Sequence, residues 1–418
     1  MINPFRSNQQ YKNIATLRGP QDAVTTLTFS AQAKFLAATG LGGVNVWNIN
    51  NHQVIPFASS KVGVPHPNKI VFPVAIWVYF MQRSQHVLLL GTCDSTIQLW
   101  DYVEERATFE LKRTSTRHEK STQVVSIDSF QTEVASGGQA KIAVSFFDRT
   151  VSVLTFTINR GLKKKFSVPF EESFMLKTVR FEVGSGNIFV FAMNGGSVAL
   201  LEGKTGNTIW RKMDAPSPYV SSWPLILDLL LHFLYRGSIS VDRRCKQFVA
   251  CTSQGFELFD LERVSPIKQF ESEPIRLSFP KCTIFTEDDT KVVGSTDCGC
   301  AEVYDLKTGK MVQTLEYKYE GLVQAVSACQ TAEHFLAAIA GSNGHQVSDV
   351  LLWQKPRPQS SFSPKPDNIL FRVNFPIKKS WFMQAGYRIL FFGILFGYSS
   401  LVAFYSDSMP SQSFLLQF

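Results

Sequence analysis

The chain has 418 residues, of which 44% are hydrophobic and 18% are charged, a composition that excludes a disordered protein and allows a large core. Its formal net charge of +8 is a mild excess, whereas nucleic-acid binders more often concentrate basic residues on one element. Seven scattered cysteines with no CxxC pair, and no Asn-x-Ser/Thr sequon, argue against a secreted disulfide scaffold. We therefore expect the bulk of the chain to be cytosolic or nuclear.

A unit of apolar strands and tight turns recurs seven times along the chain. Within a unit the hydrophobicity has period two, as in "TIQLWD", where Ile97 and Leu99 face one side and Gln98 and Trp100 the other. Each unit ends near an aromatic residue or a leucine. These closing positions, in chain order, are Trp47, Trp100, Leu154, Leu200 or Leu201, Phe259, Tyr304 and Trp353.

Seven such units predict an all-β fold, a seven-bladed β-propeller over residues 11–354. One four-stranded blade cannot bury both of its faces, but a ring of blades can, and the ring leaves only short sheet edges. The seventh unit lacks an outer strand, while residues 11–17, "YKNIATL", have strand character and precede the first full unit. We expect this N-terminal strand to complete the last blade and close the ring.

The units also share a turn aspartate and an aromatic-Asp ending, seen best in "TCDSTIQLWD". The opening segment "LRGPQDAVTTLTFS" is of the same type, with Gly19 and Pro20 where Gly-His is usual. On these motifs the chain resembles the WD-repeat (WD40) propellers, as a divergent member. The residues that carry the resemblance, besides the closing positions, are Asp94, Asp101, Asp148 and Asp297. The resemblance implies a non-catalytic scaffold that binds proteins on its faces and loops, with an incomplete His–Ser/Thr–Trp–Asp network because the histidine is absent.

No catalytic constellation is apparent, since HExxH, GxSxG and GxGxxG motifs are absent and the seven histidines lack metal-ligand spacing. We therefore expect no enzyme activity, no cofactor and no bound metal. One alternative is a quinoprotein-like oxidoreductase, because Thr205, Gly206 and Trp210 match the recurrent "TG…W" of those enzymes once. The basic run at residues 163–165 leaves a second alternative, a soluble nuclear or cytosolic propeller that binds nucleic acid or chromatin, although we expect a solvated loop there.

Two segments interrupt or follow the repeats. Residues 223–235, "WPLILDLLLHFLY", are apolar but too short to span a bilayer, and predict either an insertion packed on the propeller rim or a docking element for a partner or membrane. Residues 355–380 are rich in proline, serine and basic residues and predict an extended linker.

Residues 381–405 predict a C-terminal transmembrane helix. Between Ile389 and Tyr405 no residue is charged, and a helix of that length spans about 26 Å, close to the thickness of a thin bilayer. Gly393 and Gly397 form a GxxxG pair of the kind that favours helix association. A helix packed on the propeller is the alternative.

Charge around this segment predicts its orientation. Lysines and arginines precede it, whereas only Asp407 follows it, in the short tail 406–418. The positive-inside bias then predicts a tail-anchored protein whose propeller lies in the cytosol. If the helix packs on the propeller instead, a soluble cytoplasmic or nuclear protein is expected.

Overall fold

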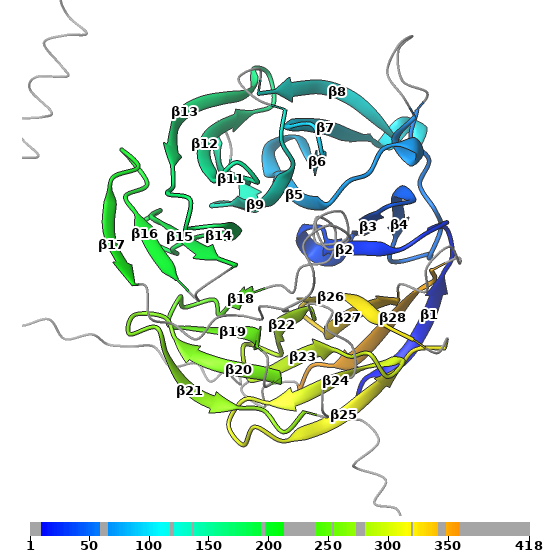
Figure 1. The fold of residues 1–418 in the computed structure, drawn as a ribbon. Coiled ribbons are helices and arrows are strands. Elements are labelled where there is room, and N and C mark those ends of the chain that lie inside the picture. Colours follow the sequence, from blue (N-terminus) through cyan, green and yellow to red (C-terminus); the bar gives the residue numbers. More distant parts are fainter. Residues whose placement is uncertain are drawn as a thin grey trace, which may run out of the picture. The chain divides into compact units, whose positions relative to one another are not determined.

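The computed structural model describes residues 10–58, 66–117, 121–135, 138–193, 197–212, 239–252, 255–272, 281–318, 321–341 and 348–358. The chain divides into two units, Met1–Gln359 and Ser360–Phe418, and all of the described residues belong to the first. They form seven sheets that follow one another around a ring (Figure 1). The expectation of an all-β, seven-bladed propeller is confirmed.

The blades are numbered here in chain order. Blade 1 contains β2 (Val24–Phe29), β3 (Phe35–Gly40) and β4 (Gly43–Asn48). Blade 2 contains β5 (Val74–Phe80), β6 (Gln85–Gly91), β7 (Thr96–Val103) and β8 (Thr108–Thr116), with β10 (Glu133–Val134) added parallel to β5. Blade 3 contains β9 (Val124–Ser129), β11 (Ala140–Phe146), β12 (Thr150–Thr157) and β13 (Gly161–Pro169). Blade 4 contains β14 (Leu176–Phe181), β15 (Ile188–Ala192), β16 (Val198–Leu201) and β17 (Thr208–Lys212).

The remaining blades complete the ring. Blade 5 contains β18 (Ile239–Val241), β19 (Gln247–Thr252), β20 (Gly255–Asp260) and β21 (Ser265–Gln269). Blade 6 contains β22 (Thr283–Thr286), β23 (Lys291–Ser295), β24 (Cys300–Asp305) and β25 (Met311–Glu316). Blade 7 contains β26 (Val323–Gln330), β27 (His334–Gly341), β28 (Val350–Pro356) and β1 (Lys12–Leu17). Short 3-10 helices lie in the connections, namely η2 (Ala31–Ala33), η3 (Pro67–Lys69), η4 (Met81–Arg83) and η5 (Glu104–Arg106).

The last blade combines the two ends of the described chain. β1 pairs antiparallel with β28, from Lys12 opposite Gln354 to Leu17 opposite Val350. Just before β1, the hydroxyl of Tyr11 lies 3.0 Å from that of Thr286 in blade 6. The N-terminal segment is therefore bonded to two blades.

The second strand of each blade is apolar on both of its faces. All five residues of β15, "IFVFA", are buried, because one face packs on the preceding blade and the other on the following blade. In the described residues, seven buried clusters each combine residues of two adjacent blades, and together they link blade 1 through blade 7 and back to blade 1. The hydrophobic core is therefore a closed series of interfaces between blades.

Blade 1 departs from the expected four strands. After β4, Val54 makes an isolated bridge with Trp47, and the chain then crosses to blade 2. There Phe57 bridges Phe109 of β8, and the backbone N–H of Ala58 donates to the carbonyl of Phe109 at 2.8 Å. The segment that would have been the outer strand of blade 1 instead ties blades 1 and 2 together at the rim.

Among the described residues, no helix is long and apolar enough to cross a membrane. The segment 381–405, with Ile389, Gly393, Gly397 and Tyr405, lies outside those residues, as does the apolar segment 223–235. The expectations for both segments stay predictions.

Candidate interaction surface

The closing positions of the repeats lie on the third strands of their blades. Trp47, Trp100, Phe259 and Tyr304 are buried, whereas Trp353 is half-buried. Opposite most of them the outer strand contains a β-bulge, a single extra residue that interrupts the ladder. The bulges opposite residues 100, 154, 200, 259, 304 and 353 are seen as register shifts. The outer strand is thus interrupted opposite the closing position in six of the described blades.

The polar atoms of Trp47, Trp100 and Tyr304 bind within their own blade or the segment that leads into it. Trp100 Nε1 donates to Gln98 Oε1 at 3.0 Å, and the Tyr304 hydroxyl donates to Glu302. Trp47 Nε1 donates to the Arg18 carbonyl at 3.1 Å. Among the described residues, Trp353 Nε1 is buried without a hydrogen-bond partner. Because the indole N–H groups of Trp100 and Trp47 donate to these acceptors, they do not take part in a His–Ser/Thr–Trp–Asp network.

Two of the turn aspartates bind a cation from the segment that leads into their blade, which is where the WD-repeat pattern carries its histidine. The Asp148 carboxylate lies 2.9 Å from Arg117 Nη1, and Asp297 Oδ2 lies 3.0 Å from Lys281 Nζ. The side chains of Lys281 and Asp297 are only 4% and 3% exposed. A buried ion pair thus joins the turn of blade 6 to its opening segment.

The aspartates of the second repeat have other partners. Asp94 accepts a hydrogen bond from the Thr92 hydroxyl, and Asp101 Oδ2 accepts one from Gln85 Nε2 at 2.6 Å. Burial raises the pKa of Asp101 to about 6. Both aspartates thus bind neutral donors, so the cation contact is a feature of blades 3 and 6.

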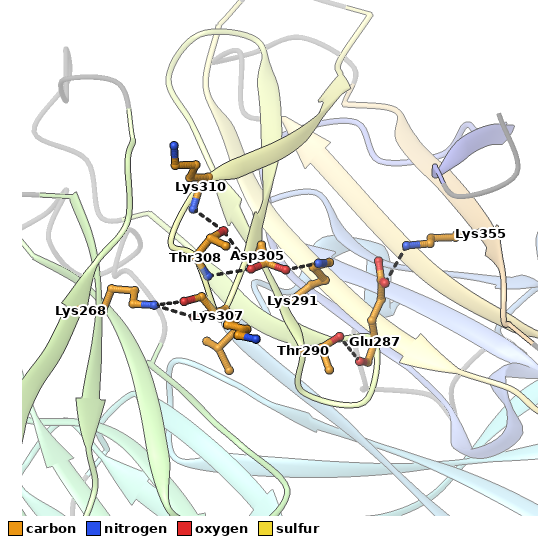
Figure 2. A network of polar contacts seen from close by, with 10 residues as sticks. Lys268, Glu287, Thr290, Lys291, Asp305, Lys307, Thr308, Lys310 and Lys355 are labelled. Atoms are coloured by element: carbon orange, nitrogen blue, oxygen red, sulfur yellow. Dashed lines mark hydrogen bonds and ion pairs between the residues drawn. The ribbon is translucent and has the colours of Figure 1, made fainter. Parts of the chain in front are cut away.

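An acidic turn between β22 and β23 lies among basic side chains from the neighbouring blades. Residues 287–289 all have positive φ, a conformation that residues other than glycine rarely adopt. Glu287 lies 2.7 Å from Lys355 Nζ of β28 (Figure 2). The next residue, Asp288, contacts Arg243 of blade 5 and Arg357 of blade 7. These ion pairs connect three blades through one turn.

The same blade has a second group of polar contacts at the β24–β25 turn (Figure 2). Lys291 binds the Asp305 carboxylate, and this hydrogen bond lowers the pKa of Asp305 to about 2. The backbone N–H of Thr308 donates to Asp305 Oδ1 at 2.7 Å. Lys268 of blade 5 donates to the carbonyls of Leu306 and Lys307. The Lys291–Asp305 pair thus stabilises the turn within blade 6, and Lys268 joins this turn to blade 5.

The rim carries two sectors of different character, defined by the extra residues of the outer-strand bulges. In the four consecutive blades 4 to 7 the extra residue is aliphatic and between 38% and 51% exposed. We call this set the aliphatic sector; it consists of Ile209, Ile267, Val312 and Ile14. In blades 2 and 3 the extra residues are Lys112 and Lys165.

The outer strands of blades 2 and 3, with the turn that precedes β13, carry six exposed cations, which we call the basic sector. Its members are Lys112, Arg113, Arg160, Lys163, Lys164 and Lys165. Glu110 is the one carboxylate on these two strands, and it already binds Arg106 and Lys112. The basic sector therefore has a strong excess of positive charge.

One arginine of the basic sector connects its two blades. Arg113 of β8 donates to the carbonyls of Asn159 and Arg160, at 2.6 and 3.1 Å, in the turn that precedes β13. Gly161 follows this turn with φ +71°, and a Cβ there would lie 2.6 Å from Arg113 Cδ. Glycine thus allows the arginine side chain to cross the turn.

A hollow of about 280 Å³ lies next to this junction. It is lined by residues of the η4 turn of blade 2 and of the β12–β13 turn of blade 3, together with Ala135 and Gly138. Arg83 and Arg160 line it together with the polar side chains of Gln82, Thr157 and Asn159, and no carboxylate is among the lining residues. The hollow is suited to a small anionic group.

The sequence pointed to only part of this surface. The run at residues 163–165 is visible as three adjacent lysines, but Arg83, Arg113 and Arg160 come from separate segments with no common motif. Comparison of the chain with protein-family models and with curated proteins finds no match. Within the described residues, no group of three or more His, Cys, Asp or Glu side chains is arranged to hold a metal ion.

Proposed function

We propose that the chain is a non-catalytic scaffold, a divergent WD-repeat propeller that binds other proteins at its rim and is tethered to a membrane by residues 381–405. The observation that carries the scaffold proposal is the aliphatic sector, which repeats one kind of exposed side chain at the same bulge of four consecutive blades. We infer from this repetition that the aliphatic sector is the surface on which a protein partner docks.

The bulges also indicate how a partner would bind. A bulged outer strand is a poor template for an added strand, because the extra residue breaks the row of backbone donors and acceptors. A partner on this rim therefore contacts side chains, among them Ile209, Ile267 and Val312, and does not extend the sheets.

The tether is supported by the closure of the ring. β1 completes blade 7 on β28, and the seven blade interfaces are filled by residues up to Leu352. The apolar run from Ile389 to Tyr405 is thus not needed to complete these seven interfaces, and its length suits a bilayer. The basic residues before it favour a cytosolic propeller.

Fractionation of cells tests both parts of the proposal. We expect the full-length chain to remain in the membrane pellet after an alkaline carbonate wash, and a chain that ends at residue 380 to wash off. If both chains wash off, the tether is wrong.

Chemical crosslinking in membrane pellets that contain the full-length chain tests whether partners dock at the aliphatic sector. The variant Ile209→Lys/Ile267→Lys/Val312→Lys is expected to lose most crosslinked protein partners. The matched control Val54→Lys/Val183→Lys changes two aliphatic residues that are also exposed but lie outside the sector, and it is expected to keep them. Equal crosslinking of the unchanged full-length chain, the triple variant and the control variant would contradict docking at this sector.

A further inference from the structure

We propose that the basic sector and its hollow bind the phosphate-bearing headgroups of anionic lipids at a membrane surface. This inference rests on the tether proposed above, because a chain held at a bilayer keeps its propeller within reach of the headgroups. It adds to that function a second membrane contact, which orients the propeller on the surface.

The basic sector carries positive charge that the described part of the protein does not neutralise. Within the described part of the chain, Lys163 and Lys165 have no ion-pair partner. Arg211 of β17, on another outer strand, differs in this respect, because it binds Glu171 and stacks on Phe174. A basic surface attracts an anionic membrane by about 1 kcal/mol per lysine or arginine near it.

The hollow beside the basic sector is lined by cationic residues of both of its blades. Arg83 and Arg160 line it from two different blades, and guanidinium groups bind phosphate with paired N–H donors. Thr157 and Asn159 add polar side chains in the same wall. An exposed phosphate group could therefore be bound by two arginines at once, which a flat row of lysines does not achieve.

An exposed apolar residue lies beside Arg83 in the η4 turn. Met81, in the same turn as Arg83, is 52% exposed. A methionine next to cations suits the boundary between headgroups and acyl chains, where apolar side chains enter the membrane and basic ones remain at its surface.

The same observations disfavour a single-stranded nucleic acid as the ligand. Bases are bound by stacking on exposed aromatic rings. On β8 and β13 the aromatic residues are Phe109, which is buried, and Phe166, which is half-buried, so no ring on these strands is fully exposed.

The test uses the full-length chain reconstituted into vesicles of phosphatidylcholine alone or of phosphatidylcholine with phosphatidylserine. A membrane-impermeant acylating reagent labels exposed lysines, and mass spectrometry compares Lys163 and Lys165 with Lys204 and Lys307, which are exposed on other blades. We expect Lys163 and Lys165 to be labelled several-fold more slowly in the anionic vesicles, an effect that high salt reverses, with no change at the two reference lysines.

A matched pair of variants tests the hollow. Arg83→Gln/Arg160→Gln should remove most of this protection, because each arginine contributes to the contact while the reporter lysines are unchanged. The control Arg244→Gln/Arg263→Gln, which changes two exposed arginines of blade 5, should retain it. Equal labelling of Lys163 in the two kinds of vesicle would overturn the proposal, and so would protection by a single-stranded RNA oligomer but not by phosphatidylserine.

Failure of the tether gives a different result. If residues 381–405 do not insert, the chain does not float with vesicles of phosphatidylcholine alone. The basic sector would still make it float with anionic vesicles at low salt. Flotation with neutral vesicles therefore tests the tether, and flotation with anionic vesicles at low salt tests the basic sector.

Discussion

Arg117 and Lys281 each place a cationic side chain beside a turn aspartate. The ion pairs Arg117–Asp148 and Lys281–Asp297 thus hold their turns by charge-assisted hydrogen bonds. The two pairs differ in burial, which makes their contributions to stability distinguishable.

Lys281→Met should lower the free energy of unfolding by about 3–5 kcal/mol, because it leaves the Asp297 carboxylate buried without its cation. Guanidinium denaturation of the full chain measures this. Arg117→Met should cost less, since Arg117 and Asp148 are each 17% exposed and water can solvate the remaining charge. A loss below about 1 kcal/mol for Lys281→Met would contradict a buried, charged pair. The double variant Lys281→Met/Asp297→Leu should recover much of the loss.

His86 predicts a dependence of stability on pH. It is buried, with its ring centroid 5.0 Å from that of Phe35 and 4.4 Å from that of Tyr79, and burial lowers its pKa to about 4. The folded state therefore binds this proton less readily than the unfolded state, so His86 costs stability as the pH falls from about 6.5 to about 4. We expect His86→Phe to gain stability relative to the wild type on acidification through this window, as measured by thermal unfolding at several pH values.

Asp101, in the same blade, changes the stability with pH in the opposite direction. Its raised pKa means that the folded state binds the proton more readily, so its contribution to stability is lost as the pH rises from about 4 to about 6. In the wild type the two residues oppose each other, and only the difference between variant and wild type isolates His86. A difference that does not change with pH would show that His86 is not buried as a neutral ring.

At the scale of elements, β1 is the part whose removal should matter most. Deletion of residues 1–17 exposes the edge of β28 and uncovers Leu352 and Val350, to which Leu17 is packed. We expect a strong drop in the thermal unfolding temperature and a tendency to aggregate, because an unpaired strand edge is a template for other chains. Differential scanning calorimetry of the full chain and the deletion variant measures the change.

Deletion of residues 1–9 is the matched control. It retains Tyr11 and all of β1, so it should leave the unfolding temperature close to that of the full chain. If both deletions behave alike, the pairing of β1 with β28 does not contribute to stability, and the ring is held by its blade interfaces alone.

Several elements could be predicted from the sequence because their signal is local. Period-two hydrophobicity with an aromatic closing position identifies strands such as β7 and β24, and seven copies predict the number of blades. The crossing of Phe57 to blade 2 could not be predicted, because it depends on a pairing between distant segments. The same holds for the hollow, since Arg83 and Arg160 meet only after two blades have packed together.

At the scale of the whole ring, the two rim sectors occupy different blades. The basic sector lies on blades 2 and 3, and the aliphatic sector on blades 4 to 7 (Figure 1). A propeller bound to headgroups through the first sector would leave the second free for protein. The two proposed contacts are therefore compatible within one molecule, and loss of one by substitution should not abolish the other.

During synthesis, β1 is the first of the described strands to leave the ribosome and its partner β28 is the last of them. At ordinary elongation rates the two are separated by about 20 to 70 s. Blades 1 to 6 can form in order during this time, while the segment 12–17 waits with no neighbour on which to pair. Closure of the ring is thus a single late event, and through most of translation the nascent chain depends on its first strand remaining free of other partners.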